Sequence, residues 1–293
     1  MKSNPTLFIV GATGYIGASL LANANKVGST IGTSSSGGED LLPLRLDAPA
    51  GFDYGKIRSG DVVLLTAAIS APDICAHDYN RARNVNVTGT SDFIQSAIDR
   101  GARVIFFSSD TVYGEHEDEF DETTACSPAG EYAEMKRELE QRFLGMELFK
   151  TIRLSYVFSQ EDKFSRYLIG CTERNEEAEL FHPFFRAIVH REDVIQGALA
   201  LATRWNEVPE QIINFGGPQV LSRVDFAECL REAHLYELRF KVTEPSKDFF
   251  KNRPQIIAMT SPVFARLLGR QPRTLNEAAR FEFTSLSDNS RFS

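Results

Sequence analysis

Tyr132 and Lys136 are the residues whose types and spacing most directly suggest chemistry. They lie in the stretch EYAEMKRELEQRF, which is typical of a helix, and a separation of four residues places both side chains on one helical face. A phenol has an ordinary pKa near 10, about three units or about 4 kcal/mol from neutrality, and a neighbouring ammonium group favours its ionised form. Such a tyrosine can give a proton to an oxygen that gains negative charge during carbonyl reduction. Because the same spacing is common on ordinary helix surfaces, the pair needs supporting residues.

Ser109 is the first supporting residue. It ends the apolar run RVIFFSS (103–109), which predicts a buried strand, 23 residues before Tyr132. The carboxyl ends of parallel strands face the ligand crevice of an α/β sheet. A hydroxyl at that position can donate a hydrogen bond to a carbonyl oxygen and orient it. The alternative reading is a turn or cap serine, which the nearby Gly114 makes reasonable.

A glycine-rich turn follows the first predicted strand. In TLFIVGATGYIGASLLANA, the residues Gly11, Gly14 and Gly17 form a GxxGxxG pattern between a strand and a helix. Glycine lets the backbone turn tightly and approach a pyrophosphate, which then lies over the positively charged end of the helix. The context therefore predicts a dinucleotide site.

The end of the second strand bears on the choice of dinucleotide. An NAD site usually places an acid there, which accepts hydrogen bonds from the ribose. The strand STIGT (29–33) instead leads into the three serines 34–36, and the acids Glu39 and Asp40 come later. Neutral hydroxyls tolerate a 2′-phosphate, so we favour NADP(H) and keep NAD as the alternative. The strand end has no arginine, and Arg45 is the nearest.

The elements that must position these residues alternate along the first half of the chain. Strands are expected at 6–10, 29–33, 41–46, 61–67, 103–109 and 149–155, and helices near 15–26, 79–100 and 129–145. Strands that alternate with helices predict a Rossmann-type, doubly wound parallel α/β sheet. We expect residues 1–155 to form the dinucleotide-binding domain and residues 156–293 to form a smaller substrate-binding region. Segments near 185–200 and 211–217 are expected to return to the main sheet.

Composition narrows the class of protein. The 293 residues are 42% hydrophobic and 25% charged, with a formal net charge of −8 and no run of basic residues. This balance argues against binding to nucleic acid or to anionic lipid. No segment has the length and apolar character of a signal peptide or a membrane span, so we expect a cytoplasmic protein. The four cysteines are scattered without metal-ligand spacing, so reduced thiols and no metal site are expected.

Several motifs together resemble one family, the extended short-chain dehydrogenases/reductases, also described as the NAD-dependent epimerase/dehydratase family. The glycine turn, LTAAIS, NVNVTGT, FFSSDTVYGE and YAEMK occur in that family's order, and RAIVHREDV and INFGGPQVLSRVDFAE are similar to its C-terminal pieces. The resemblance covers essentially the whole chain. It implies an NAD(P)-binding Rossmann domain and a smaller domain that binds a nucleotide sugar.

The resemblance also implies roles for individual residues. Ser109 would hold the substrate oxygen, Tyr132 would be the general acid/base, and Lys136 would lower the tyrosine's pKa and hold the nicotinamide ribose. Asp47 would contact the adenine ring. The full set of expected cofactor-binding residues is Gly11, Thr13, Gly14, Tyr15, Ile16, Gly17, Thr33, Ser34, Leu46, Asp47, Thr66, Ala67, Ala68, Asn86, Tyr132 and Lys136.

Within the family, the sequence looks most similar to the dTDP-4-dehydrorhamnose reductase branch. The 4,6-dehydratases carry a Thr-Asp-Glu run before VYG, whereas this chain has Ser109, Asp110 and Thr111, which disfavours elimination. The short chain, the serine-rich second strand and RLSYVF (153–158) resemble the reductase branch, although SDTVYGE is closer to the epimerases. A nucleotide-sugar epimerase with retained NAD and a non-catalytic, cofactor-binding regulatory subunit are the alternatives.

The substrate side of the sequence is less specific. Arg186 and His190 could face a pyrophosphate, or they could form pairs with Glu192 or Asp193. The helices expected at 79–100 and 129–145 form a dimer interface in many family members, so a homodimer is possible. The expected partner is a small nucleotide-sugar substrate.

Overall fold

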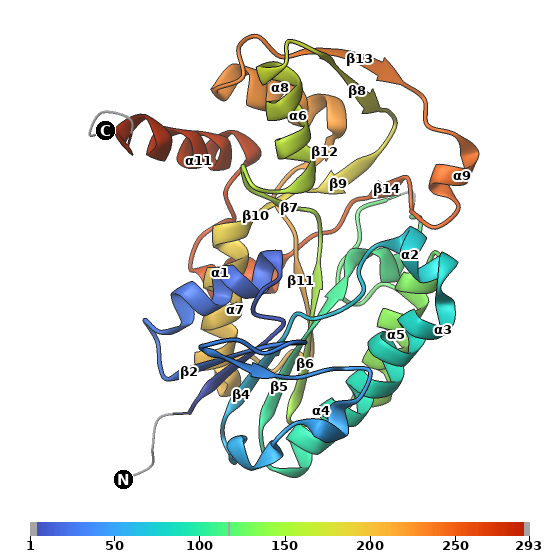
Figure 1. Ribbon diagram of the computed structural model, residues 1–293. Coiled ribbons are helices and arrows are strands. Elements are labelled where there is room, and N and C mark those ends of the chain that lie inside the picture. The colour runs from blue at the N-terminus through green and yellow to red at the C-terminus, as the bar shows by residue number, and fades with distance from the viewer. Residues whose placement is uncertain (1–4, 117, 290–293) are drawn as a thin grey trace.

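A seven-stranded parallel sheet forms the centre of the structure (Figure 1). The computed structural model of the chain describes residues 5–116 and 118–289. The strand order is β11-β6-β5-β4-β1-β2-β3, and every neighbouring pair is parallel. The strands are β1 (Leu7–Val10), β2 (Thr30–Ser34), β3 (Leu41–Pro43), β4 (Val62–Leu65), β5 (Arg103–Ser109), β6 (Phe149–Leu154) and β11 (Ile212–Phe215). The order reverses between β1 and β4, where open α/β sheets form their ligand crevice. The predicted fold class is confirmed.

Helices cover both faces of this sheet because its strands are apolar on both sides. Side chains along a strand alternate between the faces, so Ile9 packs with Leu20 on one face. Phe8 packs with Phe93 and Leu139 on the other face. The covering helices are α1 (Tyr15–Ala24), α7 (Arg191–Thr203) and α10 (Pro262–Leu268) on the first face, and α4 (Thr90–Asp99) and α5 (Glu131–Phe143) on the second.

The connection from β4 to α4 is helical but irregular. It consists of α2 (Pro72–His77), α3 (Tyr79–Arg83) and a π-helical segment, η3 (Asn84–Gly89), which runs directly into α4. The helix expected at 79–100 therefore has a widened stretch, and π-helical turns often occur at functional sites. The short 3₁₀ turns elsewhere are η1 (Pro49–Gly51), η2 (Tyr54–Lys56), η4 (Asp110–Tyr113) and η5 (Trp205–Glu207).

A second region lies beyond the carboxyl ends of the central strands, in the upper part of Figure 1. Its helices are α6 (Lys163–Glu173), α8 (Arg223–Ala233), α9 (Lys247–Phe250) and α11 (Leu275–Asn289). Its strands are β7 (Val157–Phe158), β8 (Glu177–Phe181), β9 (Phe185–Ala187), β10 (Val189–His190), β12 (Val220–Ser222), β13 (Arg239–Thr243) and β14 (Ile256–Ile257), in three small sheets. Phe158, Phe226 and Leu230 belong to a separate apolar core of this region. The region is placed to cover the crevice of the main sheet.

Two segments from the second half of the chain complete the first unit. β11 pairs with β6 at the edge of the main sheet, and α7 covers one of its faces. The segment at 185–200 begins differently, because β9 joins the small sheet with β12 and β14 before α7 starts. A domain boundary near residue 155 stays a prediction.

The helices and thiols add two facts about the described residues. No helix in the described part of the chain combines the length and the apolar composition that crossing a bilayer requires. All four cysteines are free: Cys75, Cys171 and Cys229 are buried, and Cys126 is partly buried. No disulfide therefore joins these four cysteines, and polar contacts such as the hydrogen bond from Tyr15 to Ser159 link the two regions.

Candidate functional site

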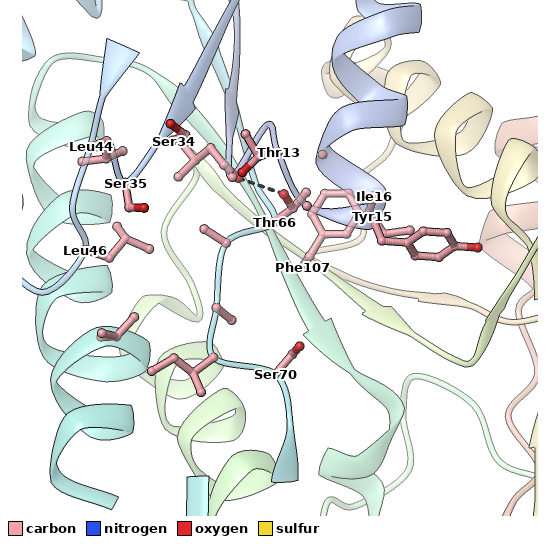
Figure 2. Close-up of a pocket in the computed structure, with 18 of the residues that line it drawn as sticks. Thr13, Tyr15, Ile16, Ser34, Ser35, Leu44, Leu46, Thr66, Ser70 and Phe107 are labelled. Atoms are coloured by element: carbon pink, nitrogen blue, oxygen red, sulfur yellow. Dashed lines mark hydrogen bonds between the residues drawn. The ribbon is translucent and has the colours of Figure 1, made fainter. Parts of the chain in front are cut away.

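A cavity of about 860 Å³ lies at the carboxyl end of the sheet, around the glycine turn. Figure 2 shows part of its wall, with Ser34, Ser35, Leu44 and Leu46 along one side and Tyr15 on another. All but two of the residues expected to bind the cofactor line it: Gly11, Thr13, Gly14, Tyr15, Ile16, Gly17, Ser34, Leu46, Asp47, Thr66, Ala67, Ala68, Tyr132 and Lys136. Most of the residues that were predicted to bind a cofactor therefore lie around one cavity in the folded chain.

The glycine turn is shaped by close backbone approach. Gly11 has a φ of +87°, which side chains rarely tolerate, and a Cβ on Gly17 would lie 2.0 Å from the carbonyl oxygen of Gly11. Gly14 precedes α1, and no side chain caps that helix. The first N–H groups of α1 are therefore available to a ligand beside the cavity, as a pyrophosphate requires.

Residues that follow β4 contact the same glycine turn. The hydroxyl of Thr66 donates a hydrogen bond of 2.8 Å to the carbonyl oxygen of Val10, drawn as a dashed line in Figure 2. A Cβ on Gly11 would lie 2.9 Å from Ala67. The small residues at this strand end thus leave the turn and the cavity side by side.

Charged groups gather where β2 and β3 end, which we call the β2–β3 end of the cavity; Ser34, Ser35, Ser36, Leu44, Arg45, Leu46 and Asp47 line it. Arg45 donates two hydrogen bonds to Asp47, with Nε 3.1 Å from Oδ1 and Nη2 2.7 Å from Oδ2. This pairing lowers the pKa of Asp47 below its ordinary value. Glu39 and Asp40 do not line the cavity.

Two expected cofactor residues lie elsewhere. Thr33 is buried at the end of β2 and does not line the cavity. Asn86 is buried in η3, where its side chain accepts from the backbone N–H of Ile69 at 2.8 Å and donates to the carbonyl oxygen of Ile69 at 2.9 Å. Ile69 itself lines the cavity. Asn86 thus fixes the loop after β4, and its contact with the cavity is indirect.

Tyr132 and Lys136 both face the cavity from α5. The ammonium group of Lys136 donates to the carbonyl oxygen of Phe107 at 2.8 Å and lies 5.7 Å from the centre of the Tyr132 ring. It also lies 4.5 Å from the centre of the Phe106 ring. The lysine is therefore fixed between its own helix and the end of β5.

Burial controls the protonation of both groups. Burial lowers the pKa of Lys136 to about 8, while the charge of Glu140 acts in the opposite direction. Burial raises the pKa of Tyr132 above its ordinary value, and Cys75 and Asp110 add to the effect. The phenol is thus held protonated. The resemblance implied the opposite shift for Tyr132, but Lys136 is not among the groups that act on it here.

Ser109 and Asp110 line a cavity together with Tyr132. The hydroxyl of Ser109 donates to Asp110 at 3.2 Å and accepts from the hydroxyl of Thr111 at 2.9 Å. Asp110 also accepts from Ser155 at 2.8 Å, and its burial raises its pKa. The Ser109 hydroxyl already donates its hydrogen bond to Asp110. A substrate oxygen can accept that hydrogen bond only if it displaces Asp110.

Ser109 and Asp110 line a second cavity of about 1000 Å³ between the two regions. The two cavities adjoin, and Tyr132 lies in their shared wall, which is lined by Thr13, Gly14, Tyr15, Ser70, Ser108, Tyr132 and Leu154. Four cations, Lys163, Arg166, Arg186 and Arg191, line this second cavity. The acids Asp110, Glu161 and Asp162 line it as well, and Arg191 pairs with Glu161. Among the described residues of this wall, Lys163 and Arg166 are the cations left to face an anionic ligand that reaches Tyr132.

The two substrate-side candidates behave differently. Arg186 is buried in the wall of the second cavity, where its guanidinium lies 4.0 Å from the centre of the Phe184 ring and donates to the carbonyl oxygen of Pro254 at 2.7 Å. His190 lies outside the cavity and bonds Glu282 at 2.9 Å in a buried pair. His190 therefore joins α11 to the fold. Arg186 lines the cavity, but both of its terminal nitrogens already donate to backbone carbonyl oxygens.

Several residues that line the first cavity were not predicted as site residues: Ser35, Ser36, Arg45, Ser70, Arg81, Val85, Phe107, Ser108 and Leu154. A signal existed for Ser108, which adjoins Ser109, and for Arg45, which lies two residues before Asp47. Nothing in the sequence indicated that Lys136 would bind the carbonyl oxygen of Phe107, because a backbone acceptor leaves no trace in residue identity.

The sheet order, the glycine turn and the tyrosine–lysine helix place the chain in the extended short-chain dehydrogenase/reductase class, as the motifs predicted. The family described as "RmlD substrate binding domain" matches residues 5–282. The chain belongs to that family.

Individual relatives agree with this assignment. The chain is 32% identical over 143 residues to the dTDP-4-dehydrorhamnose reductase of Mycobacterium tuberculosis, a match that covers 47% of the chain and 45% of that protein. The match thus spans less than half the length of these relatives. A solved dTDP-4-dehydrorhamnose reductase from Clostridium acetobutylicum has a TM-score of 0.80 and 19% identity, covering 96% of this chain and 99% of that one.

A second solved structure, "MoeE5 in complex with UDP-glucuronic acid and NAD", has a TM-score of 0.78 and 19% identity, covering 98% of this chain and 99% of that one. The epimerase of UDP-glucuronic acid from Bacillus cereus, solved with UDP-glucuronic acid and NAD, has a TM-score of 0.76 and 18% identity, covering 97% and 99%. At these identities the solved structures bear on the fold alone.

Proposed function

We propose that this chain binds a nicotinamide dinucleotide, with a preference for NADPH, and reduces the keto group of a nucleotide-linked sugar. The reaction would be of the type carried out by dTDP-4-dehydrorhamnose reductases, whose name the partly matching relatives carry. The first cavity fits a dinucleotide, because a close-packed glycine turn and the uncapped start of α1 lie together in its wall.

The observation that carries the proposal is the position of Tyr132. Its side chain lines both the cavity around the glycine turn and the cavity that lies between the two regions. A phenol at this junction can contact a dinucleotide on one side and a sugar on the other. A protein that only stored a cofactor would have no need of a proton donor there.

The chain's own groups suit reduction. Tyr132 is protonated, because burial raises its pKa, and it can give that proton to a carbonyl oxygen that gains negative charge. Ser109 can donate a second hydrogen bond to the same oxygen once Asp110 is displaced. A nicotinamide cofactor supplies the hydride when it is bound. Lys163 and Arg166 line the second cavity and can hold the diphosphate of the sugar nucleotide.

The decisive experiment incubates the purified protein with NADPH and a panel of 4-keto nucleotide sugars, while the absorbance of NADPH is followed. Consumption of NADPH together with formation of the reduced sugar supports the proposal. Isomerised sugar without net consumption would instead indicate an epimerase. Tight binding of NADPH with neither product would indicate a regulatory, cofactor-binding protein and would reject the proposal.

A further inference from the structure

The β2–β3 end of the first cavity is unusual for a protein with a net charge of −8. Two arginines, Arg45 and Arg81, line the cavity together with the three serines 34–36. Among the described residues that line this cavity, Asp47 is the one carboxylate. The acids Glu39 and Asp40, which follow the second strand in the sequence, are absent from its wall. The cavity wall is therefore basic where β2 ends.

Ser34 is the last residue of β2 and lines the cavity. A site that prefers NAD presents a carboxylate there, which binds the ribose hydroxyls and repels a phosphate. The hydroxyl of Ser34 instead donates to the carbonyl oxygen of Gly37 at 3.0 Å, so it carries no charge and is turned to its own loop. A phosphate at this position meets no repulsion from β2.

Arg45 is held in a way that a stronger anion can undo. Its guanidinium donates two hydrogen bonds to Asp47. The side chains of Arg45 and Asp47 are, however, 64% and 36% exposed. Exposed ion pairs are screened by solvent and contribute little to stability. The pair does, however, keep a planar fork of donors beside the serines, and that fork matches phosphate as well as it matches carboxylate.

We propose that Arg45 recognises the 2′-phosphate of NADPH by exchanging its partner Asp47 for that phosphate. The inference rests on the proposed function, since it concerns the same cofactor. A ribose phosphate carries up to two negative charges near neutral pH, against one for the carboxylate, so it competes well for the guanidinium. NADH offers only a hydroxyl at this position and leaves Arg45 on Asp47.

Asp47 and Arg81 adjust this exchange. Asp47 opposes the phosphate, both as a competitor for Arg45 and as a nearby negative charge, so it limits the preference for NADPH. Arg81 carries a second positive charge that also acts on Asp47. Its own partner, Asp78, is 4.0 Å away, and the side chain of Arg81 is 71% exposed. Arg81 therefore provides weaker, longer-range attraction than Arg45.

The test uses the full chain and two fragments that differ only at the ribose, 2′,5′-ADP and 5′-AMP, with binding measured by titration calorimetry. The quantity compared is the ratio of the two dissociation constants in the wild type, Arg45→Ala, Arg81→Ala and Asp47→Asn. The control is Arg174→Ala, because Arg174 is also an exposed arginine paired with an acid two residues later, Glu176, and lines neither cavity. NADPH and NADH are titrated in parallel.

We expect Arg45→Ala to reduce the preference for 2′,5′-ADP about tenfold or more, because a charge-assisted pair is lost. Arg81→Ala should reduce it less, Asp47→Asn should increase it, and Arg174→Ala should leave it unchanged. An unchanged ratio in Arg45→Ala would overturn the inference while leaving the proposed function in place. A wild type that binds NADH but shows no preference for the phosphate would also overturn it. A wild type that binds none of the four ligands would reject both.

Discussion

The ammonium group of Lys136 lies 2.8 Å from the carbonyl oxygen of Phe107, at the end of β5, and 5.7 Å from the centre of the Tyr132 ring. The lysine thus joins the helix that carries Tyr132, the proposed proton donor, to the strand that carries Ser109. Because it is buried, its charge acts in surroundings of low dielectric constant, where electrostatic effects are strong.

Tyr132→Phe is expected to lower turnover by about 10²- to 10⁴-fold, the usual contribution of a positioned general acid. The ring remains, so its packing against the buried cluster that includes Met135 and Cys75 is retained. The affinity for NADPH should therefore change little. Steady-state rates and NADPH fluorescence titration measure the two effects. Tyr79→Phe serves as the control, since Tyr79 is 42% exposed and lines neither cavity. Full activity in Tyr132→Phe would refute the assignment of the donor.

The pH dependence of kcat/KM should follow the protonation of Lys136. Its pKa is lowered to about 8, so the ammonium form dominates below that pH and is lost above it. We expect kcat/KM to fall as the pH rises through about 8. Glu140 raises the pKa of Lys136, and Cys75 acts in the same direction. Glu140→Gln should therefore move the midpoint to lower pH, whereas Glu138→Gln, which removes an acid paired with Arg83 and Arg142, should not.

A control for folding is needed for Glu140→Gln. Glu140 pairs with the buried Arg153, with Nη2 2.7 Å from Oε2, and accepts from Ser108 at 2.6 Å. Loss of one partner leaves a buried charge and costs about 3–5 kcal/mol. The double variant Glu140→Gln, Arg153→Met removes both charges and should recover part of that stability. A midpoint that stays at the wild-type pH in both folded variants would count against Glu140 as the group that acts on Lys136.

Asn86→Asp should separate the two hydrogen bonds that hold the loop after β4. The carboxylate can still accept from the N–H of Ile69, but it cannot donate to the carbonyl oxygen of Ile69. A lost buried hydrogen bond costs about 1–3 kcal/mol, and the added negative charge is also buried. We expect a lower midpoint of urea unfolding and weaker dinucleotide binding. Unchanged binding in the folded variant would show that this loop does not shape the cavity.

Gly17→Ala should disrupt the glycine turn. The new methyl group would meet the carbonyl oxygen of Gly11 at 2.0 Å, so the backbone has to shift. Such overpacking costs about 1–3 kcal/mol and would displace the first turn of α1. Dinucleotide affinity should fall with stability. Gly51→Ala is the matched control, because nothing lies within 4 Å of its added Cβ. Equal losses of dinucleotide affinity in Gly17→Ala and Gly51→Ala would show that the close packing of the glycine turn is not needed for binding.

The alternation of apolar strands and helices was sufficient to predict the main sheet, because that pattern is local. β1 and β5 lie within a residue of their expected bounds. The helix expected at 79–100 is helical but contains the π-helical η3, since periodicity does not separate one helical hydrogen-bond pattern from the other. The small sheets of the second region were not predicted, because they depend on pairing between distant segments.

The site was predictable where a residue type alone defines a role. Gly11, Gly17 and Tyr132 were expected on residue type and spacing, and all three line the cavity, while their roles stay predictions. Thr33 does not line the cavity although the next residue, Ser34, does, and both are buried at the end of β2. A role for Thr33 in cofactor binding stays a prediction. The partner of Arg45 was also beyond prediction, since a flexible side chain takes its direction from neighbours that only the folded chain supplies.

The edge strand β11 has a consequence for attempts to divide the protein. Residues 212–215 lie parallel to β6, and the backbone N–H of Thr151 donates to the carbonyl oxygen of Gln211 at 2.7 Å. A fragment that stops at residue 155 would lack β11 and leave the backbone amide and carbonyl groups along that edge of β6 unpaired. Unpaired strand edges promote self-association. Split-gene or limited-proteolysis designs should therefore keep both halves present, so that the later half can anneal to the earlier one.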